Sequence, residues 1–573
     1  MKTLRRPSHR PFYVLAGGGL LWGCLVSLTG GLSLEAYGIP FSSREPVRAL
    51  VLSAVSGCIA MFLHLGPTFR VSAAALAKAG ACGIAVTVGT VLWLTIDRGA
   101  FVAGGADSSG YLSQARLWQQ GLPRVPQPLA LELPWPEAEL ALTPLAFCPC
   151  AKRDELVPVP AQGYPLAMAA TRAVFGPGAE FSVVPVAAAG LVLCTYLLGA
   201  TLWGTMVGLL AAVLLATSPP FLLQAFQPMS DVPAAFWWTL ALTLGLSRRP
   251  ASVVAAAAAT AMAIATRPNM APIGPLLAAL LFVIQRSGAA AVPVHRFAWR
   301  SVFAGTIGGA LFVAILNNAL YGSPLSSGYG GLADLYSAGN VLPNLSRYGT
   351  WLVSTETPLI AIVLLSPLIT PESSPARRVR WYGILVGVMV MASYLPWKLF
   401  DIWHYLRFLL IAYPLMYLLL VSGCVIPRLR DGWLRRWLPV IVFAVVGFTH
   451  AKELVAKDVF AIANFERRYR TVGEYVDRTV PRKAVVLSMQ QSGSVNYYSG
   501  RQILRYDYLD PDWLERAVEL FEGKGMKCYA VLEDWEVVLF RDRFQTASPL
   551  GRLDWRPLIV IEDISVYELR PPD

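Results

Sequence analysis

The sequence predicts an α-helical polytopic membrane protein of about 13 spans, followed by an extracytoplasmic C-terminal domain of mixed α/β structure. Of its 573 residues, 55% are hydrophobic and only 15% are charged, and the mean hydropathy is +0.51. A soluble protein of this size would carry more charge. The apolar residues also gather in long runs, which indicate a transmembrane domain over residues 1–450 and a second domain over residues 451–573.

The apolar runs define the individual spans. A hydrocarbon core of about 30 Å needs roughly 20 apolar residues per helix, and shorter runs can cross when they are buried among neighbouring helices. Four basic residues within the first ten favour a first span with a cytoplasmic N-terminus over a cleaved signal peptide. The predicted spans are 13–34, 47–64, 71–96, 181–202, 205–218, 232–246, 252–266, 270–285, 300–318, 357–370, 382–396, 405–425 and 437–450.

Loop charge gives the orientation. Lys and Arg gather in the connections "SRRPAS", "QRSGAAAVPVHRFAWR", "PARRVRW" and "PRLRDGWLRRW", which the positive-inside rule places in the cytoplasm. The large loop at about 97–180 and the C-terminal tail then lie outside, and we expect a multi-pass protein of the inner (plasma) membrane. Because this topology explains the net charge of +12, we predict no nucleic-acid partner.

The C-terminal tail has a different pattern. Its runs "KAVVLSM", "QILRYDYL", "KCYAVLED" and "PLIVIEDISVYEL" are typical of short strands. The segment "DPDWLERAVELFEGKG" is typical of a helix, with an acidic residue near its start and a glycine at its end. These signals predict a small α/β domain.

The outer connections carry polar motifs that a simple linker does not need. Two acidic positions stand out, Asp107 in "DSSGYLSQARLW" and Asp231 in "QPMSDVPAAF". A carboxylate at this depth can act as a general base toward a hydroxyl group, and we choose Asp107 for that catalytic role, with Asp97 as a rival. The structural alternatives are that Asp107 caps the helix that follows it and that the helix dipole stabilises Asp231.

Three basic residues at the same face run against the positive-inside tendency: Arg267, Lys398 and Arg407. A cation at the membrane rim costs free energy unless it is paired. Phosphate is a natural partner, since Arg binds it with two hydrogen bonds and Lys binds it as a point charge. The alternative is pairing with Asp107, Asp231 or Asp401.

Aromatic residues and cysteines complete the outer face. His404 belongs to the same polar belt, although "WHY" is also typical of interface anchors. Tyr321 and Tyr329 flank a Gly- and Ser-rich segment that either orders over a substrate or forms an ordinary turn. Cys148 and Cys150 in "FCPC" lack nearby His residues, so a disulfide with Cys528, or no bond, fits better than a metal site.

Five stretches carry a family resemblance: "GADSSGYLSQARLW", "MSDVPAAFW", "TRPN", "YGSPLSSGYG" and "WHYLRFLLIAYP". In their order and shared outer side, over roughly residues 71–425, they resemble the C-type (GT-C) membrane glycosyltransferases. The resemblance is greatest to the bacterial branch similar to protein O-mannosyltransferases and lipid A aminoarabinose transferases. It implies an inverting transferase that moves a sugar from a polyprenyl-phosphate donor to a glycan, lipid or protein acceptor.

The resemblance also implies roles for single residues. Asp107 matches the first acidic motif, which supplies a base or an orienting carboxylate, and Asp231 matches the second. Arg267, Lys398 and Arg407 would hold the lipid phosphate. The chain departs from the family in having two spans before the one that leads into the acidic loop, and in having one acid where many relatives have two. We therefore expect no cofactor; a divalent cation is compatible with the pattern but is not indicated by it.

Two other functions fit the sequence less well. A multi-span transporter would also place polar residues among its helices, but we find no inverted repeat, and the long outer loop is unusual for that class. A polysaccharide polymerase or ligase would use the same lipid phosphate with a different acceptor.

Overall fold

The computed structural model describes residues 73–150, 154–287, 294–330, 335–369, 375–425 and 432–570, and short pieces before residue 44. The chain divides into two units, Met1–Ala79 and Gly80–Asp573. The predicted span 47–64 lies outside the described residues, and the predicted span 13–34 is described only in short pieces, helical between residues 14 and 26 and extended at residues 32–34.

In the first unit, β1 (Leu32–Ala36) and β2 (Ile39–Ser43) form an antiparallel hairpin. The predicted span 13–34 is therefore wrong at its end, where Leu32 to Leu34 are strand. The alternation of apolar and polar residues in "LSLEA" is the period of a strand, and the sequence Gly30-Gly31 before it disfavours helix.

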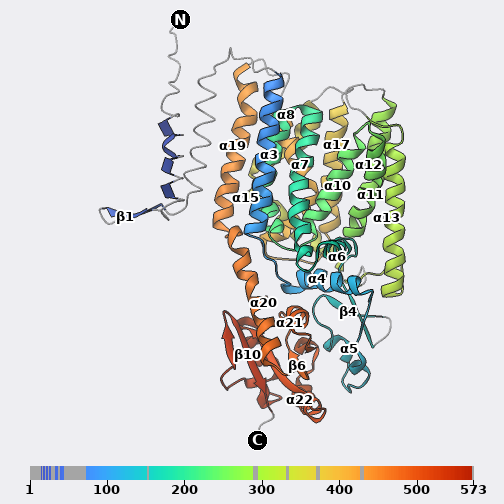
Figure 1. The fold of residues 1–573 in the computed structure, drawn as a ribbon, viewed down its shortest axis with the longest axis vertical. Helices are drawn as coiled ribbons and strands as arrows, with labels where there is room; N and C mark the ends of the chain where they lie inside the picture. Colours follow the sequence, from blue (N-terminus) through green and yellow to red (C-terminus); the bar gives the residue numbers. More distant parts are fainter. Residues whose placement is uncertain are drawn as a thin grey trace. The chain divides into compact units, whose positions relative to one another are not determined.

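The second unit is built on a bundle of apolar helices (Figure 1). Several of these helices are hydrophobic on all sides, as expected for segments that face lipid or other helices and not water. The helices of the bundle are α3 (Ala73–Asp97, within this unit from Gly80), α7 (Val183–Trp203), α8 (Thr205–Thr217), α9 (Pro219–Ala225), α10 (Asp231–Gly245), α11 (Pro250–Thr266), α12 (Ile273–Arg286), α13 (Ala298–Tyr321), α15 (Val341–Glu356), α16 (Ile362–Ile369), α17 (Pro375–Tyr394), α18 (Tyr413–Gly423) and α19 (Gly432–Ala456).

Short 3-10 helices precede four helices of the bundle: η3 (Pro268–Met270), η4 (Ala338–Asn340), η5 (Pro358–Ala361) and η6 (Trp403–Ala412). Proline begins η3 and η5, and it also begins α9, since it fits the first turn of a helix and cannot continue a preceding one.

Among the described residues, six helices are long and apolar enough to cross a membrane, or up to eight if each bent pair is one span. The bent pairs are α8 with α9, at 63°, and the helix ending at Glu356 with the one after Pro358, at 110°. The chain is a multi-pass membrane protein, while the predicted count of about 13 spans is not reached by the described residues. Two apolar runs that we interpreted as full spans, 205–218 and 357–370, each belong to a pair of helices that is bent at a residue preceding a proline.

The segment after α3 lies across one end of the bundle (Figure 1). Its main element, α4, packs against α6 and against α21 (Ser492–Ser499) of the C-terminal region. Three short strands in it pair in the order β3-β5-β4. The elements are α4 (Gly105–Gln120), β3 (Val125–Pro126), η1 (Pro128–Leu131), α5 (Ala138–Ala141), β4 (Phe147–Pro149), β5 (Glu155–Pro158), α6 (Gly163–Phe175) and η2 (Ala179–Ser182).

The C-terminal region contains a five-stranded sheet in the order β7-β6-β8-β10-β9, in which β6 runs parallel to β7 and β8, and β10 runs antiparallel to β8 and β9. The strands and the helix α22 form within the segments that we expected. The elements are η7 (Val459–Ala461), α20 (Ile462–Thr479), β6 (Ala484–Leu487), α21 (Ser492–Ser499), β7 (Gln502–Leu504), η8 (Tyr506–Tyr508), η9 (Pro511–Trp513), α22 (Leu514–Gly523), β8 (Lys527–Glu533), α23 (Asp534–Phe544), η10 (Pro549–Arg552), β9 (Ile559–Ile561) and β10 (Ile564–Leu569).

The C-terminal region holds the start of α4 in place. The hydroxyl of Tyr498 accepts a hydrogen bond from the backbone N–H of Ala103 at 2.8 Å, and Arg116 donates to the carbonyl of Tyr497 at 2.9 Å. At Gly104, an added Cβ atom would overlap the carboxylate of Glu466 and come within 2.9 Å of the Tyr469 ring. A side chain at this position would therefore require Glu466 to move, so glycine suits the close approach of α20 to the beginning of α4.

Candidate active site

Asp107 lies in the first turn of α4, and Arg407 lies in η6. The Nη2 atom of Arg407 is 2.8 Å from Oδ2 of Asp107, and their side chains are 13% and 33% exposed. The N-cap of α4 is Gly104, with no side-chain capping hydrogen bond. Arg407 is therefore the partner that Asp107 contacts, and the pair keeps some access to solvent.

A second ion pair lies deeper. Asp231 is the first residue of α10, and Arg267 follows α11 in a non-helical conformation just before Pro268. The Nη2 atom of Arg267 lies 2.5 Å from Oδ1 of Asp231, and its Nη1 donates to the Tyr394 hydroxyl at 2.6 Å. Because Pro268 ends α11 at this point, the guanidinium is directed toward the start of the neighbouring helix α10.

The two ion pairs form one cluster, which we call the outer cluster: Asp107, Asp231, Arg267 and Arg407. Arg407 also interacts electrostatically with Asp231 and Arg267. The ring of Phe408 lies under both guanidinium groups, at 5.8 Å from that of Arg267 and 5.2 Å from that of Arg407. The structure thus brings together two acidic and two basic residues from four separate segments.

Tyr111 joins the two pairs, although the sequence analysis assigned it no role. Its hydroxyl lies 2.8 Å from the hydroxyl of Ser230, the residue before Asp231. Burial, followed by the negative charge of Asp107, raises the pKa of Tyr111 above its ordinary value, so its hydroxyl stays protonated. The signal was present in the sequence, since Tyr111 is four residues after Asp107 and so shares its helix face.

Of three other predicted site residues, two lie near the outer cluster and one does not. Tyr329, 42% exposed, interacts electrostatically with Asp107, Arg267 and Arg407, and His404 interacts with Asp107 and Arg407. Tyr321 lies elsewhere: its hydroxyl donates to the carbonyl of Pro158 at 2.7 Å, which ties the end of α13 to β5.

Three further candidates take no part in the described contacts of the outer cluster. Lys398 is exposed and forms no ion pair with any described residue. Asp97 pairs with the adjacent Arg98 at 2.9 Å, and Asp401 pairs with Arg347. Of the three acids expected as alternative partners for these cations, Asp107 pairs with Arg407 and Asp231 pairs with Arg267.

The cysteines of the outer segment are not bonded. Cys148, Cys150 and Cys528 are free thiols, which agrees with the second of the two alternatives for them. Cys528 is fully buried in β8, inside the core of the C-terminal sheet. It is therefore a small core residue, as buried free cysteines usually are.

Comparison with known proteins rests on solved structures. No protein-family model matches this sequence, and no curated protein matches it. ArnT from Cupriavidus metallidurans bound to undecaprenyl phosphate aligns with a TM-score of 0.53 and 11% identity over 84% of this chain and 97% of that one. The same protein in its apo state gives 0.52 and 11% over 86% and 98%. The chain thus has the fold of the C-type (GT-C) membrane glycosyltransferases, as its motifs predicted.

Proposed function

We propose that this chain is an inverting glycosyltransferase, which moves a sugar from a polyprenyl-phosphate donor to an acceptor at the outer face of the inner membrane. The observation that carries the proposal is the outer cluster, where two guanidinium groups are gathered next to a partly exposed carboxylate. A lipid phosphate is the ligand that two arginines at a membrane rim suit best.

The hydrogen bonding of the outer cluster is incomplete. Three of its buried polar atoms have no hydrogen-bond partner among the described residues: Oδ2 of Asp231, Nε of Arg267 and Nε of Arg407. An unpaired buried polar atom costs about 1–3 kcal/mol. A bound phosphate would give the two Nε donors an acceptor, and a hydroxyl of the substrate would give Asp231 a donor.

Arg407 donates a hydrogen bond to the Asp107 carboxylate at 2.8 Å and so occupies the proposed base. In the proposed reaction the donor phosphate competes for Arg407 and so releases Asp107. Donor binding would then produce the base only when there is a sugar to transfer.

The chemical step is a single in-line displacement. The acceptor oxygen attacks the anomeric carbon, the bond from that carbon to the phosphate oxygen breaks, and its electron pair leaves with the phosphate. Asp107 takes the proton of the acceptor hydroxyl, and Arg267 and Arg407 neutralise the charge on the leaving phosphate. Attack from the side opposite the phosphate inverts the anomeric carbon. Tyr329 and His404, near Asp107, would contact the sugar or the acceptor.

The fold supports the donor class. ArnT from Cupriavidus metallidurans, whose fold this chain shares, binds undecaprenyl phosphate in one of its structures. The positive-inside pattern of the loops supports an extracytoplasmic location for the outer cluster and for the C-terminal α/β region, residues 451–573. Lys398, exposed near this face, would contact the phosphate or the lipid headgroups around it.

The direct test uses the purified chain in lipid nanodiscs with polyprenyl-phosphate sugars and candidate acceptors. We expect release of polyprenyl phosphate and an inverted product, and we expect Asp107→Asn to lower turnover by about 10²–10⁴-fold without unfolding the protein. Near-normal turnover of Asp107→Asn would remove the base assignment.

A cell-based test separates the alternatives. Deletion of the gene followed by mass spectrometry of lipids and surface glycans should show accumulation of a sugar-lipid and loss of one glycan substituent. Unchanged glycans together with altered solute uptake would favour a transporter instead, and shortened or unattached polymers would favour a polymerase or ligase.

A further inference from the structure

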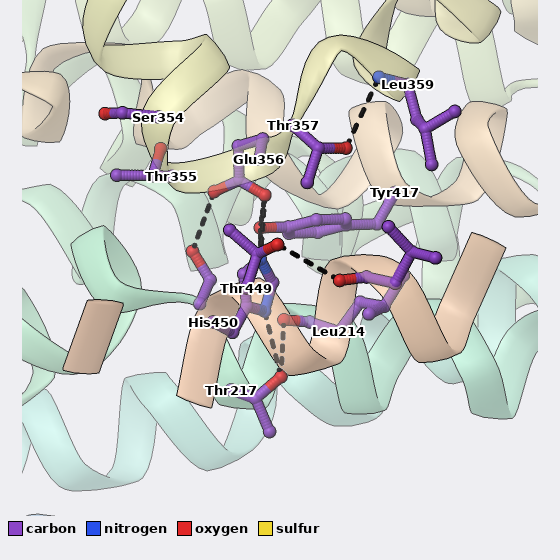
Figure 2. Close-up of polar contacts among 12 residues, drawn as sticks. Leu214, Thr217, Ser354, Thr355, Glu356, Thr357, Leu359, Tyr417, Thr449 and His450 are labelled. Atoms are coloured by element: carbon purple, nitrogen blue, oxygen red, sulfur yellow. Dashed lines mark hydrogen bonds and ion pairs between the residues drawn. The ribbon is translucent and has the colours of Figure 1, made fainter. Parts of the chain in front are cut away.

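A second polar cluster lies inside the helix bundle, at residues that the sequence pattern does not single out. The Oε2 atom of Glu356 lies 2.9 Å from Nε2 of His450 and accepts a hydrogen bond from the Tyr417 hydroxyl at 2.6 Å. The other ring nitrogen of His450 is 3.1 Å from the hydroxyl of Thr217, and Ser218 donates to Oε1 of Glu356 at 3.5 Å. Figure 2 shows Glu356, Tyr417 and His450 directed toward one another. We call these five residues the inner network.

The inner network is sealed from solvent. Glu356, His450, Tyr417 and Ser218 are each 0% exposed. An ionisable pair buried among membrane helices is expensive, and such residues commonly have a functional reason. Solvent-sealed side chains do not reach a substrate directly, so a function for this network must act through the helices that carry it.

Those helices break at the inner network. Ser218 is the residue between α8 and α9, and Glu356 is the last residue of α15 before the bend into η5. The next residue, Thr357, has φ 67° and ψ 161°, a conformation that costs a β-branched residue about 1–3 kcal/mol and persists only when its surroundings impose it. The carboxylate of Glu356 thus ties two broken segments to α18 and α19.

Two of the tied segments lead directly to the outer cluster. From Ser218, α9 runs to the turn that ends at Asp231. Tyr417 lies on α18, and the 3-10 helix that runs directly into α18 is η6, which carries Arg407. The helix α9 packs against η6. On α15, Tyr348 interacts electrostatically with Arg407. The inner network and the outer cluster are therefore at opposite ends of shared segments.

We propose that Glu356 and His450 are positioning residues, which fix α9 and η6 so that Asp231 and Arg407 meet the lipid phosphate in one geometry. This inference rests on the proposed function for its activity readout. Its structural part, the positions of α9 and η6, does not depend on any reaction.

The test compares Glu356→Gln and Tyr417→Phe with Glu453→Gln, a matched control one turn after His450 on α19, where Glu453 pairs with Lys457. Tyr417→Phe keeps the ring and removes only one hydroxyl, so it remains informative if Glu356→Gln fails to fold. Hydrogen–deuterium exchange of the full chain in nanodiscs should become roughly tenfold faster in peptides covering residues 219–230 and 403–412. Glu453→Gln should leave both peptides unchanged.

Activity then separates positioning from stability. The triple variant Glu356→Met, His450→Leu, Tyr417→Phe replaces the polar groups with apolar ones of similar volume, a change that often preserves stability when a buried pair is removed. We expect normal thermal stability with kcat reduced at least about tenfold. Recovery of full turnover in this variant, or unchanged exchange at 219–230 and 403–412 in every variant, would overturn the proposal. A wild-type chain without transferase activity would instead overturn the proposed function, and the exchange result would still decide the structural part.

Discussion

The outer cluster and the inner network contain the same kinds of ionisable group but differ in their access to solvent. Asp107 in the outer cluster is 33% exposed, whereas Glu356 and His450 are 0% exposed. The outer cluster also leaves polar atoms without partners, while both carboxylate oxygens of Glu356 are hydrogen-bonded. An open, incompletely satisfied cluster is suited to a ligand, and a closed, satisfied one is suited to holding helices.

The largest effect on stability is expected when one member of the inner network is removed and its partner remains. His450→Leu removes a partner of the Glu356 carboxylate inside the bundle, and loss of one member of a buried pair costs about 3–5 kcal/mol. We expect a marked fall in the thermal unfolding midpoint, measured in detergent or nanodiscs. A midpoint equal to that of the wild type would show that the carboxylate does not depend on His450.

The opposite result is expected at the outer cluster. Arg407→Ala removes the cation that pairs with Asp107, which is partly exposed and keeps access to water. Because a hydrogen bond to a charged group contributes about 1.5–3 kcal/mol, we expect binding of undecaprenyl phosphate to weaken roughly tenfold or more. The unfolding midpoint should change less than in His450→Leu. Unchanged binding, measured by titration of the lipid phosphate, would exclude Arg407 from the phosphate site.

A smaller effect should distinguish α20 from both clusters. Burial raises the pKa of Glu466 from its usual 4.5 to about 7, with Arg468 opposing the shift. A carboxyl group with a raised pKa in the folded state contributes stability below its unfolded pKa and loses it as the pH rises through the folded value. The unfolding midpoint should therefore fall between about pH 5 and pH 8, and Glu466→Gln should reduce that slope. Equal slopes would contradict this assignment.

The smallest effect is expected at Lys398. It is exposed and forms no ion pair with any described residue, and exposed charges contribute about 0–1 kcal/mol. Lys398→Ala should change turnover by less than about fivefold. A loss as large as that of Arg407→Ala would place Lys398 on the phosphate, as the family resemblance implies.

Much of the outer cluster could be predicted from the sequence, because its members lie at or near the outer ends of apolar runs. Asp231 and Arg267 directly flank the runs 232–246 and 252–266. Arg407 lies near the start of the run 405–425, and Asp107 lies in the loop that follows the run 71–96. The strands and the helix of the C-terminal region were also predicted, since alternation and helical periodicity are local signals.

The inner network could not be predicted in the same way. Glu356 and His450 also sit at the ends of apolar runs, but their contact depends on which helices are neighbours and on the two prolyl breaks. The same breaks affect two of the predicted spans, because α8 and the helix that begins at Pro358 each meet the length and composition of a span only together with a neighbouring helix bent away from it. Periodicity within a run does not reveal such a bend.

The contacts between the C-terminal region and the start of α4 have a consequence for biosynthesis. The ribosome completes the helix that carries Asp107 long before it adds Glu466 and Tyr498, which pack against the start of that helix. A nascent chain inserted up to Ala456 therefore lacks part of what holds Asp107. We therefore expect a chain that ends at Ala456 to hold the start of α4 less firmly than the longer chain does.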